Sequence, residues 1–172
     1  VSDNAEIEQI NQRSIYATPL YAEFLDTKFN IVDTPGGDDF VGGAVSAFKV
    51  CDTGVLLINA QQGVEVGTQI FRRYARQYDI PLVIAVNQLD GEKANWEGTL
   101  DSMKESFGNK PVIIQFPVNV GTGFDGFVDV LTMKYYHFID DNGTRQDLDI
   151  PADLQDQADE LRQALIDRAA EY

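Results

Sequence analysis

Apolar residues along the chain fall into runs whose length and spacing predict alternating strands and helices. Two continuous apolar runs of strand length, GVLLINA and PLVIAVN, occupy 54–60 and 81–87. Helical spacing follows each of them, at 66–79 and at 95–108, and Gly108 is expected to end the second helix. Nearly all-apolar strands that alternate with helices predict an α/β fold with a mostly parallel sheet covered on both faces.

The N-terminal part has a different pattern. The first twelve residues are polar and weakly patterned, which predicts a mobile loop. Two β-rich runs, 17–25 and 28–33, follow, and the Asp26–Thr27 connection between them predicts a hairpin. The second run is expected to be a buried strand, and the apolar residues of 40–50 recur at helical spacing.

The character of the chain changes after residue 109. Strand-like runs occupy 110–118 and 133–140, and Pro151 is expected to open a long amphipathic helix. The apolar face of that helix is Leu154, Ala158, Leu161, Leu165 and Ala169. These patterns predict two parts, residues 1–109 and an α+β part at 110–172.

The charge balance limits the partners of the protein. Thirteen Lys and Arg against 28 Asp and Glu give a formal net charge of −15, which disfavours general binding to free DNA or anionic membranes. The visible basic cluster is Arg72, Arg73 and Arg76. The single cysteine, Cys51, excludes an intramolecular disulfide, and no apolar run approaches the ~20 residues that span a bilayer. We therefore expect a soluble, cytoplasmic protein.

The first chemical candidate is the turn that follows the strand ending at Asp33. A carboxylate there can hold a Mg²⁺-bound water, and the Gly36 N–H, with no side chain in its way, can approach a phosphate. Taken alone, the same residues are typical of an ordinary Pro-Gly turn.

The second candidate is the segment NQLD, which follows the strand at 81–87. The Asn87 amide can pair with guanine O6 and N7, and the Asp90 carboxylate can accept from guanine N1 and N2, donors that adenine lacks. Taken alone, this segment is also typical of a capped strand-to-helix turn. The two candidates together are more specific, because ligands of α/β sheets bind at the carboxyl ends of strands.

Residues 30–74 (NIVDTPGGDDFVGGAVSAFKVCDTGVLLINAQQGVEVGTQIFRRY), which include the first of these motifs, resemble the G domain of translational GTPases, most of all elongation factor G. The stretches 123–138 and 149–172 are similar to the insert subdomain of that factor. The resemblance implies a P-loop GTPase-type G domain that binds GTP and Mg²⁺. It also implies a ribosomal partner, including stalk proteins through the insert subdomain, and a role in tRNA–mRNA translocation.

The resemblance also implies roles for individual residues. Asp33 and Gly36 would belong to the γ-phosphate switch, and Asn87 and Asp90 would read guanine. Ser14 lies about where the Mg²⁺-binding threonine of the family is expected, although NQRS departs from the family's Arg-Gly-Ile-Thr. Mg²⁺ would then be held by Ser14 and Asp33.

Three departures from the family pattern bear on catalysis. Gly37 stands where the family has the His that positions the attacking water, and Gln88 replaces the Lys of Asn-Lys-x-Asp. Gln88 would still lie along the base through its methylenes, but it lacks the ammonium that joins the base loop to the phosphate loop. No phosphate-loop motif Gly-x-x-x-x-Gly-Lys-Ser/Thr occurs in these residues. Gly121 and Gly126 have the glycine spacing but lack the Lys, so we interpret them as a surface turn.

We therefore expect an internal fragment of a divergent elongation-factor-G-like protein, in which a phosphate loop would have to lie upstream of Val1. Its G domain would lack the phosphate-loop strand, and the fragment alone would be inactive. Gly37 predicts weak GTP hydrolysis in the complete protein. Two alternatives stay open: a ribosomal protection factor of the tetracycline-resistance type, and a non-hydrolytic ribosome-binding module.

Overall fold

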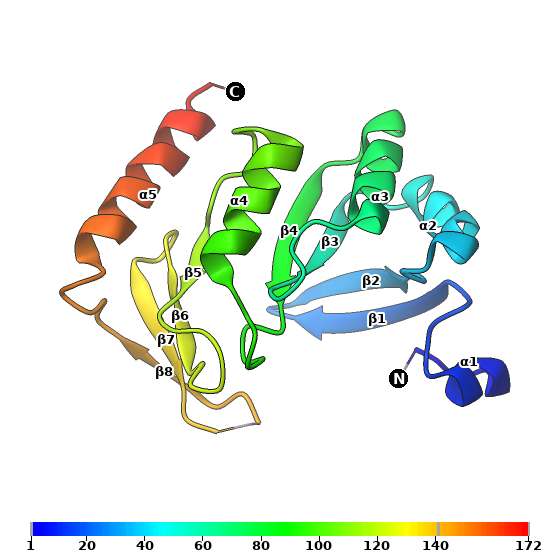
Figure 1. Cartoon of the computed structure of the whole chain (residues 1–172), viewed down its shortest axis with the longest axis horizontal. Helices are drawn as coiled ribbons and strands as arrows, with labels where there is room; N and C mark the ends of the chain where they lie inside the picture. Colours follow the sequence, from blue (N-terminus) through cyan, green and yellow to red (C-terminus); the bar gives the residue numbers. More distant parts are fainter. Residues whose placement is uncertain (1, 141, 172) are drawn as a thin grey trace. The chain divides into compact units, whose positions relative to one another are not determined.

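A computed structural model describes residues 2–140 and 142–171 (Figure 1). Two compact units are formed. The first comprises the chain up to Leu57 together with Glu65–Ala85, and the second comprises Ile58–Val64 together with the chain from Val86 onward. The predicted boundary near residue 109 stays a prediction. No helix in the described part of the chain is both long and apolar enough to cross a membrane.

The first unit begins with a helix that the sequence pattern did not predict, α1 (Glu6–Asn11). The Glu8 side chain is only 2 % exposed and accepts backbone hydrogen bonds from Ile15 (2.9 Å), Tyr16 (3.0 Å) and Ala5 (3.1 Å). The Ile15 N–H, joined by those of Tyr16 and Ala5, holds the pKa of Glu8 below its ordinary value. The expected mobile loop is therefore wrong, because one buried carboxylate ties the helix to the chain that follows it.

A hairpin follows, as predicted. Strands β1 (Thr18–Phe24) and β2 (Thr27–Asp33) pair antiparallel over their whole length, from Thr18 opposite Asp33 to Phe24 opposite Thr27. Leu25 and Asp26 connect them with φ of 47° and 57°. Two successive positive φ values are typical of the tight hairpin turn whose twist matches that of the strands.

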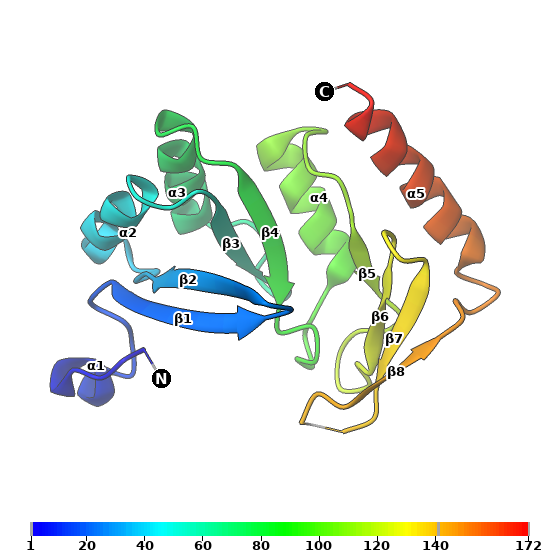
Figure 2. The same ribbon diagram turned by 180° about the vertical axis from the view of Figure 1, so that it is seen from behind.

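Two helices and the first parts of two further strands complete the first unit. After the 3₁₀ turn η1 (Asp38–Phe40), the helix α2 (Val41–Phe48) packs beside α3 (Val66–Gln77). Figure 2 shows the two helices next to each other from behind. The predicted helices at 40–50 and 66–79 are therefore confirmed.

Strands β3 (Gly54–Asn59) and β4 (Leu82–Asn87) lie at the predicted apolar runs and pair with each other. The Gly54 N–H donates to the Pro81 carbonyl at their beginnings, and the Ala60 N–H donates to the Asn87 carbonyl at their ends, each at 2.9 Å. Because the two strands are bonded start to start and end to end, they run parallel.

The expectation of a mostly parallel sheet is not met by the described strands. β1–β2 and β3–β4 form separate two-stranded sheets, because β2 and β3 are not paired with each other. Among these strands only β3 and β4 run parallel. β1 and β2 are antiparallel, as strands joined by a two-residue hairpin connection must be.

The strands of the first unit are also less covered than their apolar sequence predicted. In β3, Leu56 is buried, whereas Val55 and Leu57 are 66 % and 63 % exposed. In β2, Phe29 and Ile31 are 48 % and 45 % exposed. Successive side chains of a strand point to opposite faces, so an apolar run is buried on both sides only where elements cover both. Of the strands expected to be buried, β3 is therefore exposed on one face, and β2 is exposed on both faces over residues 27–31.

The second unit contains the helix α4 (Trp96–Phe107), with both of its ends set by the sequence. The Asn95 side chain accepts a hydrogen bond from the Gly98 N–H at 3.0 Å and caps the N-terminus. Gly108 ends the helix with φ 68°, a conformation that glycine adopts without strain. The predicted helix at 95–108 is confirmed.

A four-stranded antiparallel sheet and one helix form the main core of the second unit. The sheet has the order β5-β6-β7-β8, with bounds Gln115–Pro117, Gly126–Asp129, Lys134–Phe138 and Arg145–Leu148. The helix α5 (Gln155–Ala169) lies alongside the sheet in both views (Figures 1 and 2). The predicted strands at 110–118 and 133–140 are present but shorter than expected.

The apolar face of α5 packs on this sheet as its spacing predicted. Ala158 is fully buried in a cluster with Phe116, Val128 and Val130, and three leucines of the face pack against the same cluster. Pro151 does not open the helix, which begins at Gln155. The Pro151 carbonyl instead accepts the Leu154 N–H in a turn before it.

Candidate functional site

The turn after β2 is built around a buried proline and an open glycine. Pro35 is almost completely buried, and a side-chain carbon at Gly43 of α2 would lie only 3.3 Å from the Pro35 ring, so α2 packs closely on the turn. Gly36 has the opposite environment, because a carbon added there would meet nothing within 4 Å. Its backbone is therefore accessible, as a predicted phosphate contact requires.

Arg13 occupies the space beside Gly37. A Cβ placed on Gly37 would lie 2.6 Å from Arg13 Nη2, and the same guanidinium lies over the Phe40 ring at 5.2 Å from its centroid. A cation thus fills the place where a side chain at position 37 would extend. The sequence pattern gave no sign of this contact, because it depends on the unpredicted α1, which brings Arg13 back to the turn.

Ser14 and Asp33 are the predicted metal ligands. Asp33 ends β2, and its side chain is half-buried; Ser14 lies between α1 and β1 and is also half-buried. Within the described residues no hydrogen bond joins the two, and no three His, Cys, Asp or Glu side chains gather closely enough to hold a metal ion. Mg²⁺ is commonly held by one or two carboxylates and substrate phosphates, so the single Asp33 carboxylate fits this ion.

The second unit holds the loop after β4. The Gln88 backbone is left-handed (φ 59°), and the Gln88 side chain accepts a hydrogen bond from Asn59 Nδ2 at 2.7 Å. The Gln88 carbonyl accepts the Gly91 N–H at 3.2 Å and closes a tight turn. Gln88, expected to lie along a base, is thus bound to Asn59 at the end of β3, a partner that sequence reasoning missed.

A second segment supports this loop. The Leu89 carbonyl accepts the Gly121 N–H at 2.7 Å, so the turn at 120–124 is attached to the loop. Asn87 and Asp90 keep their side chains exposed at its rim. The interpretation of Gly121 and Gly126 as one surface turn is half wrong: Gly121 has a turn conformation (φ 86°), whereas Gly126 is buried at the start of β6 against the Tyr136 carbonyl.

The predicted residues thus form two separate groups. Ser14, Asp33, Gly36 and Gly37 belong to the first unit, and Asn87, Gln88 and Asp90 belong to the second. Apart from Ser14, which precedes β1, each group lies at the carboxyl end of a strand, which is where α/β proteins bind ligands.

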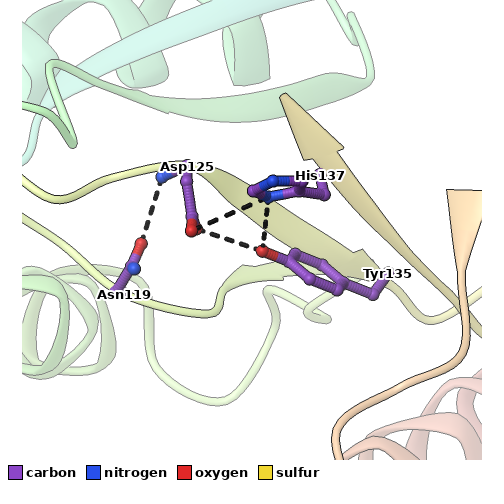
Figure 3. Close-up of polar contacts among 4 residues, drawn as sticks. All are labelled: Asn119, Asp125, Tyr135 and His137. Carbon is purple, nitrogen blue, oxygen red and sulfur yellow. Dashed lines mark hydrogen bonds and ion pairs between the residues drawn. The ribbon is translucent and has the colours of Figure 1, made fainter. Parts of the chain in front are cut away.

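The second unit also contains a polar cluster that the sequence analysis did not predict (Figure 3). The Tyr135 hydroxyl donates to Asp125 at 3.1 Å and lies 3.0 Å from His137 Nδ1, which is 3.7 Å from the same carboxylate. Burial, followed by the hydrogen bond and charge of Asp125, raises the pKa of Tyr135 to about 12. His137 is one-third exposed and part of this cluster.

The fold and the two strand-end loops define the class: a mixed α/β domain with loops at the strand ends, where α/β proteins bind ligands. Residues 1–170 match the model of the elongation factor Tu GTP binding domain family. The chain belongs to this family of GTP-binding domains, so GTP binding and GTPase activity characterise its family.

One solved structure supports the fold. A crystal structure of a protein from Thermus thermophilus matches with a TM-score of 0.86 and covers 96 % of this chain. The two sequences are 23 % identical, and this chain spans 24 % of the length of that one. At this identity the likeness concerns the fold.

Proposed function

We propose that this chain is the nucleotide-binding part of a translational GTPase of the elongation-factor-G type. The observation that carries the proposal is the family match over 1–170, since it covers both strand-end loops. The complete protein would bind GTP, associate with the ribosome in the cytoplasm and promote tRNA–mRNA translocation. Residues 110–172 would belong to the insert subdomain and contact stalk proteins.

The exposed side chains of the second unit fit a guanine base. Asn87 offers an amide donor and acceptor, and Asp90 offers a carboxylate to the paired donors of guanine. Both are exposed and make no hydrogen bond through their side chains among the described residues, so their polar atoms are available. We assign base recognition to these two residues and positioning of the loop to Gln88.

The residues of the first unit fit the phosphate side of the nucleotide. Gly36 would donate its N–H to the terminal phosphate, and Asp33 and Ser14 would hold Mg²⁺, which neutralises phosphate charge when bound. Support comes from the open space around Gly36 and the carboxylate at the end of β2. A phosphate loop supplies most phosphate-binding N–H groups, so these 172 residues alone would bind GTP weakly.

Base specificity tests this proposal. In the full-length protein, GTP should bind at least ~100-fold more tightly than ATP, because ATP leaves the Asp90 carboxylate unpaired. Asp90→Ala should reduce this preference, and Asp101→Ala, which removes an exposed carboxylate on α4, should not. Equal affinities for GTP and ATP in the wild-type protein, measured by calorimetry, would overturn the proposal.

Two alternatives are separated by other measurements. A ribosomal protection factor would release tetracycline from ribosomes, which the proposed translocation factor would not do. A non-hydrolytic ribosome-binding module is favoured by Gly37, which offers no side chain to position water. That module would bind ribosomes without turning over GTP.

A further inference from the structure

The helix α3 carries a row of positive charge on an otherwise acidic protein. Gln69, Arg72, Arg73, Arg76 and Gln77 line one surface hollow and form what we call the arginine face. Their spacing of three, four, seven and eight residues from Gln69 places them on one side of the helix. The helix itself contains no acidic residue, while the whole chain has a net charge of −15.

The arginine face points away from the packed side of α3. Thr68 and Ala75, on the other side, are buried, and α3 packs against α2. Arg73 and Arg76 are exposed, and neither forms an ion pair with any described residue. The Arg73 guanidinium lies 5.5 Å from the centroid of the Tyr74 ring, a contact that leaves its N–H groups available.

We propose that the arginine face binds the phosphate backbone of RNA when the protein docks on the ribosome. The proposal rests on the proposed function, because the ribosome supplies the RNA. Guanidinium groups present planar, paired N–H donors that match phosphate oxygens, and the flanking glutamine amides add further donors. The face contains no aromatic side chain on which a base could stack, so the contact is with the backbone and is independent of sequence.

The dimensions and the charge distribution agree with this partner. Gln69 and Gln77 are eight residues apart, about 12 Å along a helix, which is the axial rise of three to four nucleotides at ~3.4 Å each. The acidic remainder of the chain repels RNA, so a polyanion is accepted only where the arginines cluster. The arginine face therefore both attracts the protein to RNA and sets which side of the protein contacts the RNA.

Charge reversal in the full-length protein tests the inference. The double variant Arg73→Glu with Arg76→Glu should weaken binding to ribosomes at least ~10-fold at physiological salt. The slope of log affinity against log salt concentration should fall by the equivalent of about two phosphate contacts. The matched control is Lys28→Glu with Lys104→Glu, which changes the net charge equally on exposed residues elsewhere. GTP affinity should be unchanged in both variants, which shows that they are folded.

The chemical identity of the partner needs a second probe. A photo-crosslinking amino acid in place of Gln77 should yield adducts with ribosomal RNA upon irradiation of the ribosome complex. Adducts with ribosomal proteins alone would overturn the proposal, as would equal losses in the two charge-reversal variants. If the wild-type protein binds GTP but no ribosomes, the translational role fails together with this inference. If it binds ribosomes and the arginine variant binds equally well, the inference alone fails.

Discussion

At the scale of single residues, position 37 and Arg13 have to be considered together. Glycine at 37 offers no side chain that could position water, and the Arg13 guanidinium fills the space beside it. Arg13 is exposed and flexible, so it can move aside at small cost when a side chain is added. The effect of a substitution at 37 therefore depends on the chemistry of the new group.

Gly37→His in the full-length protein should raise ribosome-stimulated GTP turnover at least ~10-fold, because a positioned imidazole can orient the attacking water. GTP affinity should stay nearly constant, since Asn87 and Asp90 are unchanged. The control is Gly37→Ala, which displaces Arg13 without supplying an imidazole and should not raise turnover. A wild-type protein already as fast as Gly37→His would show that another residue orients the water.

The Tyr135 cluster makes a second prediction at this scale. Asp125→Asn should lower the pKa of Tyr135 from about 12 part of the way toward 10, because the carboxylate contributes while burial remains. Ultraviolet absorbance of the phenolate measures this titration. The difference between the wild-type protein and Tyr135→Phe identifies the part of the absorbance change that belongs to Tyr135. Because the pKa of Tyr135 is higher in the folded than in the unfolded protein, its protonated hydroxyl stabilises the fold. This stabilisation is complete below pH 10 and should be lost as the pH rises from 10 toward 12. An unchanged Tyr135 titration in Asp125→Asn would contradict the assigned cause.

At the scale of elements, the helices were more predictable than the surroundings of the strands. The spacing of apolar residues and Gly108 predicted α3, α4 and the packed face of α5, since these signals are local. α1 could not be predicted, because it depends on a buried Glu8 that accepts hydrogen bonds from residues after the helix. The exposure of Val55 and Leu57 depends on which elements cover β3, and the apolar sequence of β3 carries no information about its neighbours.

The candidate site was predictable to a similar extent. Strand-end motifs located Asp33, Gly36, Asn87 and Asp90, because a polar residue after an apolar run is visible in sequence. The contacts of Arg13 and Asn59 were not visible, because each joins segments that are distant in the chain.

The N-terminus of α4 gives a prediction about an element. Asn95→Ala should reduce the free energy of unfolding by about 1 kcal/mol, because the Gly98 N–H loses its acceptor. Asn95→Asp keeps an acceptor oxygen and should lose much less. Urea denaturation of the wild-type protein and both variants measures the difference. Equal losses in the two variants would show that the cap contributes little.

At the scale of the whole molecule, the open edges of strands β2 and β3 predict association. β2 and β3 do not pair with each other, and both expose apolar side chains, a combination that invites pairing with another chain. Self-association of the 172-residue chain, measured by analytical ultracentrifugation, should decrease with Phe29→Lys and Leu57→Lys. Val66→Lys replaces a more exposed apolar residue on α3 and should have little effect. A wild-type chain that is monomeric at every concentration would contradict this prediction.

The central claim is that the complete protein is a translational GTPase. GTP turnover by the full-length protein, measured with and without ribosomes, tests it most directly. We expect slow turnover by the protein alone, because Gly37 supplies no water-orienting side chain, and clearly faster turnover when ribosomes are added. A protein that binds GTP but shows no turnover under either condition would contradict the account and favour the non-hydrolytic ribosome-binding module.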